Sequence, residues 1–209
     1  MAQDLGRERE AAAQLQATYR DKVQAIRENA DLSAEGRQRQ IADLYASTKA
    51  KLKEHRRADQ SALTSRFEEL QNKLYVAPKP YSQDTATHAI SLRDASDRAA
   101  QLKTAEEEQD LLSRALANND DVLARAVVQH AMGQSYTGLR SAAEQWESVL
   151  IPFLDARPDL ESVVEELGEI ERMTEAIRII SPFSLPTPTD VPAAVVNAAG
   201  LHQLEGADA

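Results

Sequence analysis

The stretch AEGRQRQIADLYASTKAKLKEHRRADQSALTSRFEELQNKLY, residues 34–75, decides the fold of the first part of this chain. Residues spaced by threes and fours form one stripe along it: Ile41, Tyr45, Thr48, Leu52, His55, Asp59, Leu63, Phe67, Leu70 and Leu74. The stripe repeats about every 3.67 residues, which is the period of one helix face and close to the eleven-residue repeat. Ser33 precedes the stretch and is a good N-cap residue. The stretch therefore predicts one long α-helix.

A shorter helix is predicted before it, because apolar residues recur at helical spacing as far as Ile26. It should end near Asn29, where side chains that compete for backbone hydrogen bonds gather as far as Ser33. The two helices would span about 39 Å and about 63 Å. In an antiparallel hairpin the far third of the long helix then has no partner in the short one. That third carries our candidates for a protein-interaction surface, which must pack on the second region or on another chain: Leu63, Phe67, Leu70 and Leu74.

The long helix also carries a basic cluster, and two interpretations of it stay open. Its members are Lys49, Lys51, Lys53, His55, Arg56 and Arg57. On a helix these residues spread around more than half of the circumference, and Glu54 and Asp59 interrupt them. We therefore favour a solvated helix surface over a nucleic-acid footprint, for which Lys49, Lys51, Lys53, Arg56 and Arg57 are the candidates.

Charge is distributed unevenly between the two parts of the chain. The net charge of −10 divides into +3 for residues 1–80 and −13 for residues 81–209. Pro78 and Pro80 mark the division, since proline removes a backbone donor and favours extended geometry. Nucleic acid is an unlikely partner for the acidic region, because phosphate contacts require Lys and Arg. We expect an antiparallel helical hairpin over 1–77 and a linker over 78–84.

The remaining residues predict a small acidic helical bundle over 85–181 and a tail over 182–209. Thr104 with Glu107 matches a capping box, but the pattern leaves open whether 85–117 is one helix or two. Trp146 and Phe153 are expected to be core anchors, and clustered glutamates such as Glu106–Glu108 to be solvated. The tail holds four of the eight prolines and is expected to be largely flexible, with a docking strip as the alternative and a weakly predicted helix near its end.

The sequence shows no pattern typical of a catalytic or metal site. It has no Cys, and its seven glycines are too scattered for a phosphate-binding loop. Its four histidines lie far apart and lack metal-ligand spacing: His55, His88, His130 and His202. Residues 1–10 lack the apolar core of a signal peptide, and no apolar run is long enough to cross a membrane. We expect no catalysis, no cofactor, no metal, no membrane partner and no secretion by a signal peptide.

Two stretches resemble a group of known proteins. The first is Leu32–Arg37 with Ile41-Ala42 and Leu44-Tyr45, and the second is Asn119–Ala126 with Ala131, a tryptophan-containing helix and Arg157-Pro158. Together they span about half of the chain and are similar to small helical proteins from the virion-assembly gene blocks of actinobacterial tailed phages. The resemblance implies structural or assembly roles in the particle, with no catalytic residues to carry over.

The sequence thus predicts an all-α, non-enzymatic phage structural or assembly protein, such as a scaffold or head accessory protein. Its partners would be other copies of itself, virion structural proteins or both, and it would reside in the virion or the bacterial host cytoplasm. Self-association would let the basic hairpin of one copy meet the acidic region of another. Two alternatives remain, a helical nucleic-acid-associated regulator that uses Lys49–Arg57 and a host coiled-coil adaptor.

Overall fold

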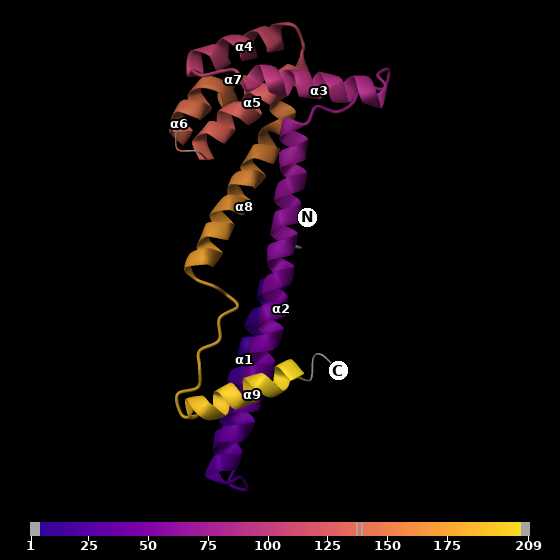
Figure 1. Cartoon of the computed structure of the whole chain (residues 1–209). Helices are drawn as coiled ribbons and strands as arrows, with labels where there is room; N and C mark the ends of the chain where they lie inside the picture. The colour runs from indigo at the N-terminus through magenta and orange to yellow at the C-terminus, as the bar shows by residue number, and fades with distance from the viewer. Residues whose placement is uncertain (1–4, 137, 139, 206–209) are drawn as a thin grey trace. The chain divides into compact units, whose positions relative to one another are not determined.

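A computed structural model describes residues 5–136, 138 and 140–205, and every regular element in these ranges is a helix (Figure 1). The all-α prediction is confirmed, since no strand occurs in this described part of the chain. The chain divides into two compact units, which we call the hairpin unit (residues 1–65 and 173–209) and the bundle unit (residues 66–172). The division therefore does not fall at the linker predicted over 78–84. It falls within two helices, α2 (Ala34–Tyr75) and α8 (Glu161–Ile179).

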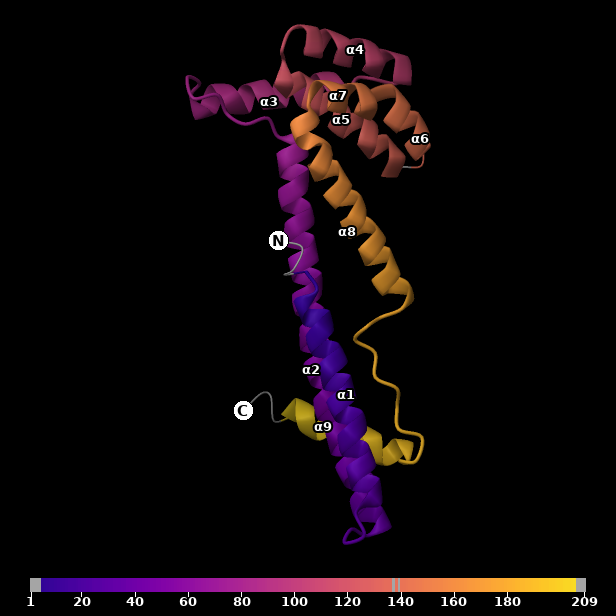
Figure 2. The same cartoon turned by 180° about the vertical axis from the view of Figure 1, so that it is seen from behind.

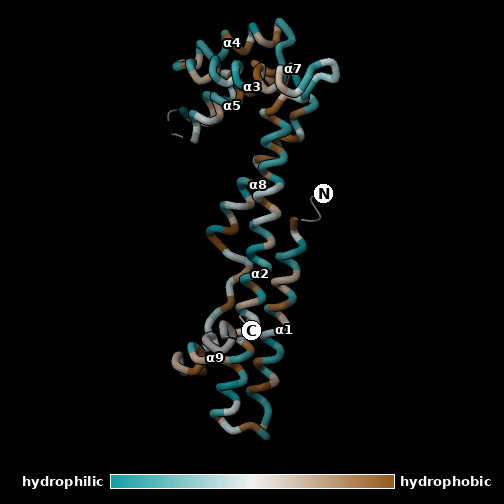
Figure 3. Tube along the Cα trace, turned by 45° about the vertical axis from the view of Figure 1, so that its right-hand side comes forward, coloured by the Kyte–Doolittle hydropathy of each residue, from teal (hydrophilic) through white to brown (hydrophobic). Residues whose placement is uncertain are grey.

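The hairpin unit is built on α1 (Arg7–Glu28) and the first part of α2. The backbone N–H of Gly36 donates to Ser33 Oγ at 3.0 Å, which confirms Ser33 as the N-cap of α2. The guanidinium of Arg37 reaches back to the carbonyls of Asn29 and Leu32, both at 3.0 Å, and closes the turn. Figure 3 shows apolar positions recurring along both helices between hydrophilic ones. The ends of the two helices thus follow the local signals in the sequence.

The polar members of the α2 stripe pair with the first turns of α1. Asp59 is 2% exposed, and its Oδ1 accepts a hydrogen bond from Arg9 Nε at 2.9 Å. One turn away, His55 Nδ1 lies 2.6 Å from Glu8 Oε2. A buried carboxylate requires a partner of this kind, because burial removes its hydration. These two pairs fix the register of α1 on α2 at the open end of the hairpin.

The C-terminal segment is the main departure from the sequence prediction. Instead of being largely flexible, residues 181–192 run in an irregular path along the hairpin and lead into α9 (Ala193–Glu205), which crosses its α2 side (Figures 1 and 2). The last residues of the predicted tail, 206–209, lie outside the described range. Two clusters of buried side chains join this segment to the hairpin. The first holds Tyr19, Val23, Ile41, Ala42, Tyr45, Ala46, Val191, Val196 and Ala199, and the second holds Ala12, Leu52 and Phe183.

Polar contacts attach the proline-rich part of the same segment. Gln16 Nε2 donates to the carbonyls of Pro182 and Ser184 at 2.9 Å and 2.7 Å. A side chain of α1 thus satisfies two backbone carbonyls of a segment that is not helical. Arg27 forms a bidentate pair with Asp190 at 2.7 Å and 2.8 Å. Hydrogen bonds from Arg27 lower the pKa of Asp190 below its ordinary value. Hydrogen bonds from side chains of α1 therefore hold this segment on the hairpin.

The bundle unit packs short helices around the end of α2. They are α3 (Thr85–Ala99), α4 (Ala105–Ala117), α5 (Asp121–Tyr136), α6 (Ala142–Gln145), a π-helix η1 (Trp146–Leu150), α7 (Ile151–Ala156), a 3-10 turn η2 (Pro158–Leu160) and the first part of α8. Residues 85–117 thus form two helices. Thr104 and Glu107 form the expected capping box at the start of the second, with Glu107 N–H donating to Thr104 Oγ1 at 3.2 Å.

Arg125 joins α5 to the end of α2 within the bundle unit. This side chain is 2% exposed, and its Nη1 donates to the carbonyls of Lys73 and Leu74 at 2.6 Å and 2.7 Å. The last carbonyls of a helix have no partner within the helix, so Arg125 satisfies groups that would otherwise be buried unpaired. Asp121 compensates the charge, accepting from Arg125 Nε at 2.8 Å and also pairing with Arg157. The end of α2 is therefore capped from another helix.

We predict that Arg125→Ala destabilises the bundle unit by about 3 kcal/mol, because it leaves two helix-terminal carbonyls and the Asp121 carboxylate without their partner. Urea unfolding followed by circular dichroism measures the change. Arg114→Ala is the matched control, since Arg114 pairs with Asp110 at the same i,i+4 spacing but is 72% exposed. Its effect should stay within about 0.5 kcal/mol. Equal losses in the two variants would contradict the capping role.

We also predict that Asp190→Asn or Arg27→Ala loosens the C-terminal segment and speeds chymotryptic cleavage after Phe183, which is 7% exposed when docked. Because the pKa of Asp190 is lowered on folding, its pairing contributes fully above the ordinary carboxyl pKa of about 4 and is lost as pH falls through the lowered value. Asp190→Asn mimics that loss at neutral pH. Arg93→Ala is the control, because it removes a more exposed pair with Asp97 in α3 of the bundle unit and should leave the cleavage rate unchanged.

Candidate functional site

The docking of α9 across α2 leaves a groove that we call the basic groove. Its volume is about 740 Å³. Helix α2 supplies one wall, and the C-terminal segment supplies the other. The lining residues are Tyr45, Ala46, Lys49, Ala50, Leu52, Lys53 and Arg56 of α2, with Phe183, Val196, Asn197 and Gly200. A site of this size falls in the range of grooves that bind small ligands or the side chains of a partner helix.

The floor of the basic groove is apolar and its rim is cationic. Leu52, Tyr45, Phe183 and Val196 are all buried and form the floor. Three exposed cations stand above it: Lys49, Lys53 and Arg56. The Lys49 ammonium lies 5.5 Å from the centre of the Tyr45 ring, a cation–π contact that holds it over this side of α2. Among the described residues that line the groove none is Asp or Glu, so the rim attracts negative charge.

Helical spacing explains why only part of the basic cluster reaches the groove. Lys49, Lys53 and Arg56 stand at i, i+4 and i+7 and share one face of α2. Arg57 is exposed beside that face, whereas Lys51 is exposed on the opposite side of the helix. Among the residues that the structure describes, the three rim cations have no ion-pair partner. The rim is therefore a concentrated patch of positive charge that no side chain in the described ranges neutralises.

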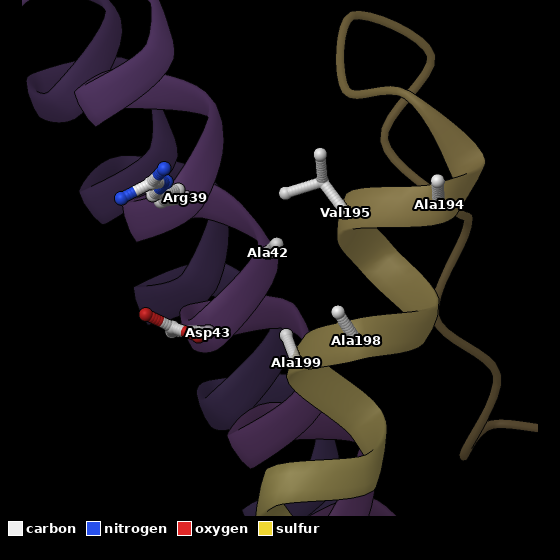
Figure 4. A pocket seen from close by; sticks show the side chains of 7 residues that line it. All are labelled: Arg39, Ala42, Asp43, Ala194, Val195, Ala198 and Ala199. Atoms are coloured by element: carbon white, nitrogen blue, oxygen red, sulfur yellow. The ribbon is translucent and has the colours of Figure 1, made fainter.

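A second, smaller groove lies on the other side of α9 and has a different chemistry (Figure 4). Its volume is about 470 Å³, and small side chains of α9 face α2 across it. Arg39 and Asp43 supply charges of both signs, and Arg39 already pairs with Glu35 at 2.6 Å. This groove therefore lacks the single-sign rim of the basic groove, and the basic groove is the stronger candidate site.

The apolar row predicted as an interaction surface is not available for one. Leu63, Leu70 and Leu74 are buried within the single chain, and Phe67 is half-buried. Three of the four belong to the bundle unit, where Arg66 clamps Glu166 of α8 with two bonds of 2.7 Å. Of the two coverings that we expected for this row, burial within the chain is therefore the one found, and the row is not left for a partner chain.

A buried polar cluster in the bundle unit was also missed by sequence reasoning. Glu108 was expected to be solvated, yet it is fully buried, 2.9 Å from His130 Nδ1 and paired with Arg140. Both side-chain polar atoms of Gln145 and the hydroxyl of Ser148 are buried without a hydrogen-bond partner in the described part. The described residues contain no grouping of three side chains suited to a metal ion.

Comparison with protein-family models, curated proteins and solved structures found no match to this chain.

Phe183 was not predicted as a site residue from the sequence. Only its large apolar side chain within a proline-rich stretch could have indicated that it is buried. We predict that Phe183→Ala costs about 3 kcal/mol, because it removes the ring that packs with Ala12 and Leu52 and opens the groove floor. Ile180→Ala is the control, since Ile180 is 79% exposed and its loss should cost less than about 0.5 kcal/mol. Urea unfolding measures both, and similar costs would contradict the docked arrangement.

Proposed function

We propose that this chain is a non-enzymatic structural or assembly protein of a tailed phage that acts through protein contacts made by the basic groove. One observation carries the proposal: the C-terminal segment is built into the hairpin core and forms a preformed wall of the groove. A preformed groove on helices binds with little ordering cost, which suits recognition of a partner surface. The resemblance of Leu32–Arg37 and Asn119–Ala126 to virion-assembly proteins supports the phage assignment.

The character of the groove also supports protein contacts. Among the helices that the structure describes, none combines the length and apolar character that crossing a membrane requires. The groove joins an apolar floor to a charged rim, the combination found at protein interfaces, where the centre is apolar and the periphery polar. This combination therefore supports partner binding as the role of the groove.

The test is to follow the chain through particle assembly in its native host. An epitope-tagged copy is expressed from its own locus, precursor and finished particles are separated on density gradients, and mass spectrometry counts the chain in each. A scaffold is expected in precursors alone, and a structural component in both. Absence of the chain from both kinds of particle would contradict the proposal. The groove variant Lys49→Glu/Lys53→Glu should lower incorporation, whereas Lys22→Glu/Lys51→Glu, with the same change in charge, should not.

A further inference from the structure

The bundle unit carries an exposed tryptophan that its predicted core role does not explain. Trp146 is the only Trp in the chain, and 40% of it is exposed, whereas Phe153 of the same segment is fully buried as predicted. Ile151 beside it is 44% exposed. Tryptophan is rare on free surfaces and is enriched among residues that dominate binding energy at interfaces. Trp146 therefore marks a contact surface.

The π-helix η1 is what places these two side chains together. The N–H of Ile151 donates to the carbonyl of Trp146, an i→i+5 bond, so the two residues lie one turn apart on the same side. In an α-helix, residues five apart would point about 140° away from each other. The wider turn also sends Ser148, Val149 and Leu150 inward, where they are buried. An irregular turn thus builds a paired apolar projection on the outside of the unit.

Acidic side chains surround this projection. Glu147 and Asp155 are both exposed and stand four residues before and after Ile151, on the helix side that also carries Ile151. The arginines nearest in sequence are already engaged within the bundle unit: Arg140 pairs with Glu108, and Arg157 pairs with Asp121 and Asp159. We call Trp146, Glu147, Ile151 and Asp155 the tryptophan patch. It is an apolar projection within a field of negative charge.

We propose that the basic groove of one copy binds the tryptophan patch of a second copy. The inference rests on the proposed function, since it names the partner of the same groove. The two surfaces are complementary in shape and in charge. The groove has an apolar floor, and the patch presents exposed apolar side chains; the groove rim is cationic, and the patch carries exposed carboxylates. Charge complementarity of this kind sets orientation and accelerates encounter.

The groove chemistry favours a protein over a nucleic acid as its occupant. Single-stranded nucleic acids bind by stacking bases on aromatic faces, but Tyr45 and Phe183 are only 5% and 7% exposed. The apolar atoms that do reach the groove surface, such as those of exposed Ala50, form no bond with a phosphate backbone, whereas an indole ring would gain free energy by burial against them. Lys51 points away from the groove, so the cationic rim is also too short for a continuous duplex footprint.

Each copy carries one groove and one patch, so the contact produces either a closed assembly or an open array. Light scattering on the full chain distinguishes the two by mass. The emission of Trp146 reports the contact itself, because an indole that leaves water for an apolar groove emits at shorter wavelength. We expect a concentration-dependent blue shift that weakens as salt is raised, since the contact includes exposed ion pairs.

Charge reversal tests the specific surfaces. Lys49→Glu/Lys53→Glu should weaken self-association at least tenfold. Trp146→Ala should weaken it about 30-fold, and light scattering measures this variant because it lacks the fluorescent indole. Glu147→Lys/Asp155→Lys should also weaken it. An equimolar mixture of the two charge-reversed variants should restore association, because the altered groove then meets the altered patch. Lys22→Glu/Lys51→Glu is the charge-matched control and should associate like the unmodified chain. Circular dichroism and melting temperature show whether each variant is folded.

Three outcomes would overturn the inference. One is a monomer at all concentrations and salt levels, another is association that the groove variant leaves unchanged, and the third is no recovery in the mixture of folded variants. Binding of a single-stranded or duplex oligonucleotide that the groove variant loses, by an otherwise monomeric chain, would assign the groove to nucleic acid instead. If the chain is found in particles but is monomeric in solution, the proposed role in assembly is supported, and only the proposed contact between two copies is contradicted.

Discussion

The packing of residues 182–200 against α1 and α2 is the interaction on which the arrangement of the hairpin unit depends. Tyr19, Ile41 and Tyr45 belong to a cluster that is completed by Val191, Val196 and Ala199, which follow 146 to 180 residues later in the chain. Gln16 accommodates the backbone of the proline-rich part, and Arg27 fixes its far end through Asp190. Without this segment the basic groove would lose one of its walls, and only a helix with a cationic face would remain.

The helices of the hairpin were predictable because their signals are local. Ser33 caps α2, the Asn29–Ser33 cluster ends the helix before it, and one apolar period persists through the length of α2. The break between α3 and α4 is also marked locally, by the Thr104 capping box. In these places side-chain chemistry and backbone geometry are linked within a few residues, so the sequence alone was sufficient to predict the all-α class.

The features that sequence reasoning missed all depend on long-range contacts. Prolines in the tail signal only that it cannot be helical there, and do not show that Phe183 finds a place against Ala12 and Leu52. In the sequence Glu108 belongs to a run of glutamates typical of a solvated helix face. Its burial depends on His130 of α5, which is 22 residues away in the chain. Trp146 looks like a core residue because it stands at helical spacing from Val149, Leu150 and Phe153, and no residue type marks a π-turn. The division of the chain by contacts also weakens the charge contrast predicted from the sequence: the hairpin unit has a net charge of −1 and the bundle unit −9, in place of +3 and −13.

The account has one central claim, that the C-terminal segment is a structural part of the hairpin and not an appended tail. Amide hydrogen exchange of the unmodified chain tests it most directly. The account predicts that residues 193–200 of α9 are protected to a degree comparable with α1, because their helix packs on the buried face of α2 through Val196 and Ala199. Exchange of these amides at the rate of an unstructured peptide would contradict the claim, and with it the existence of the basic groove.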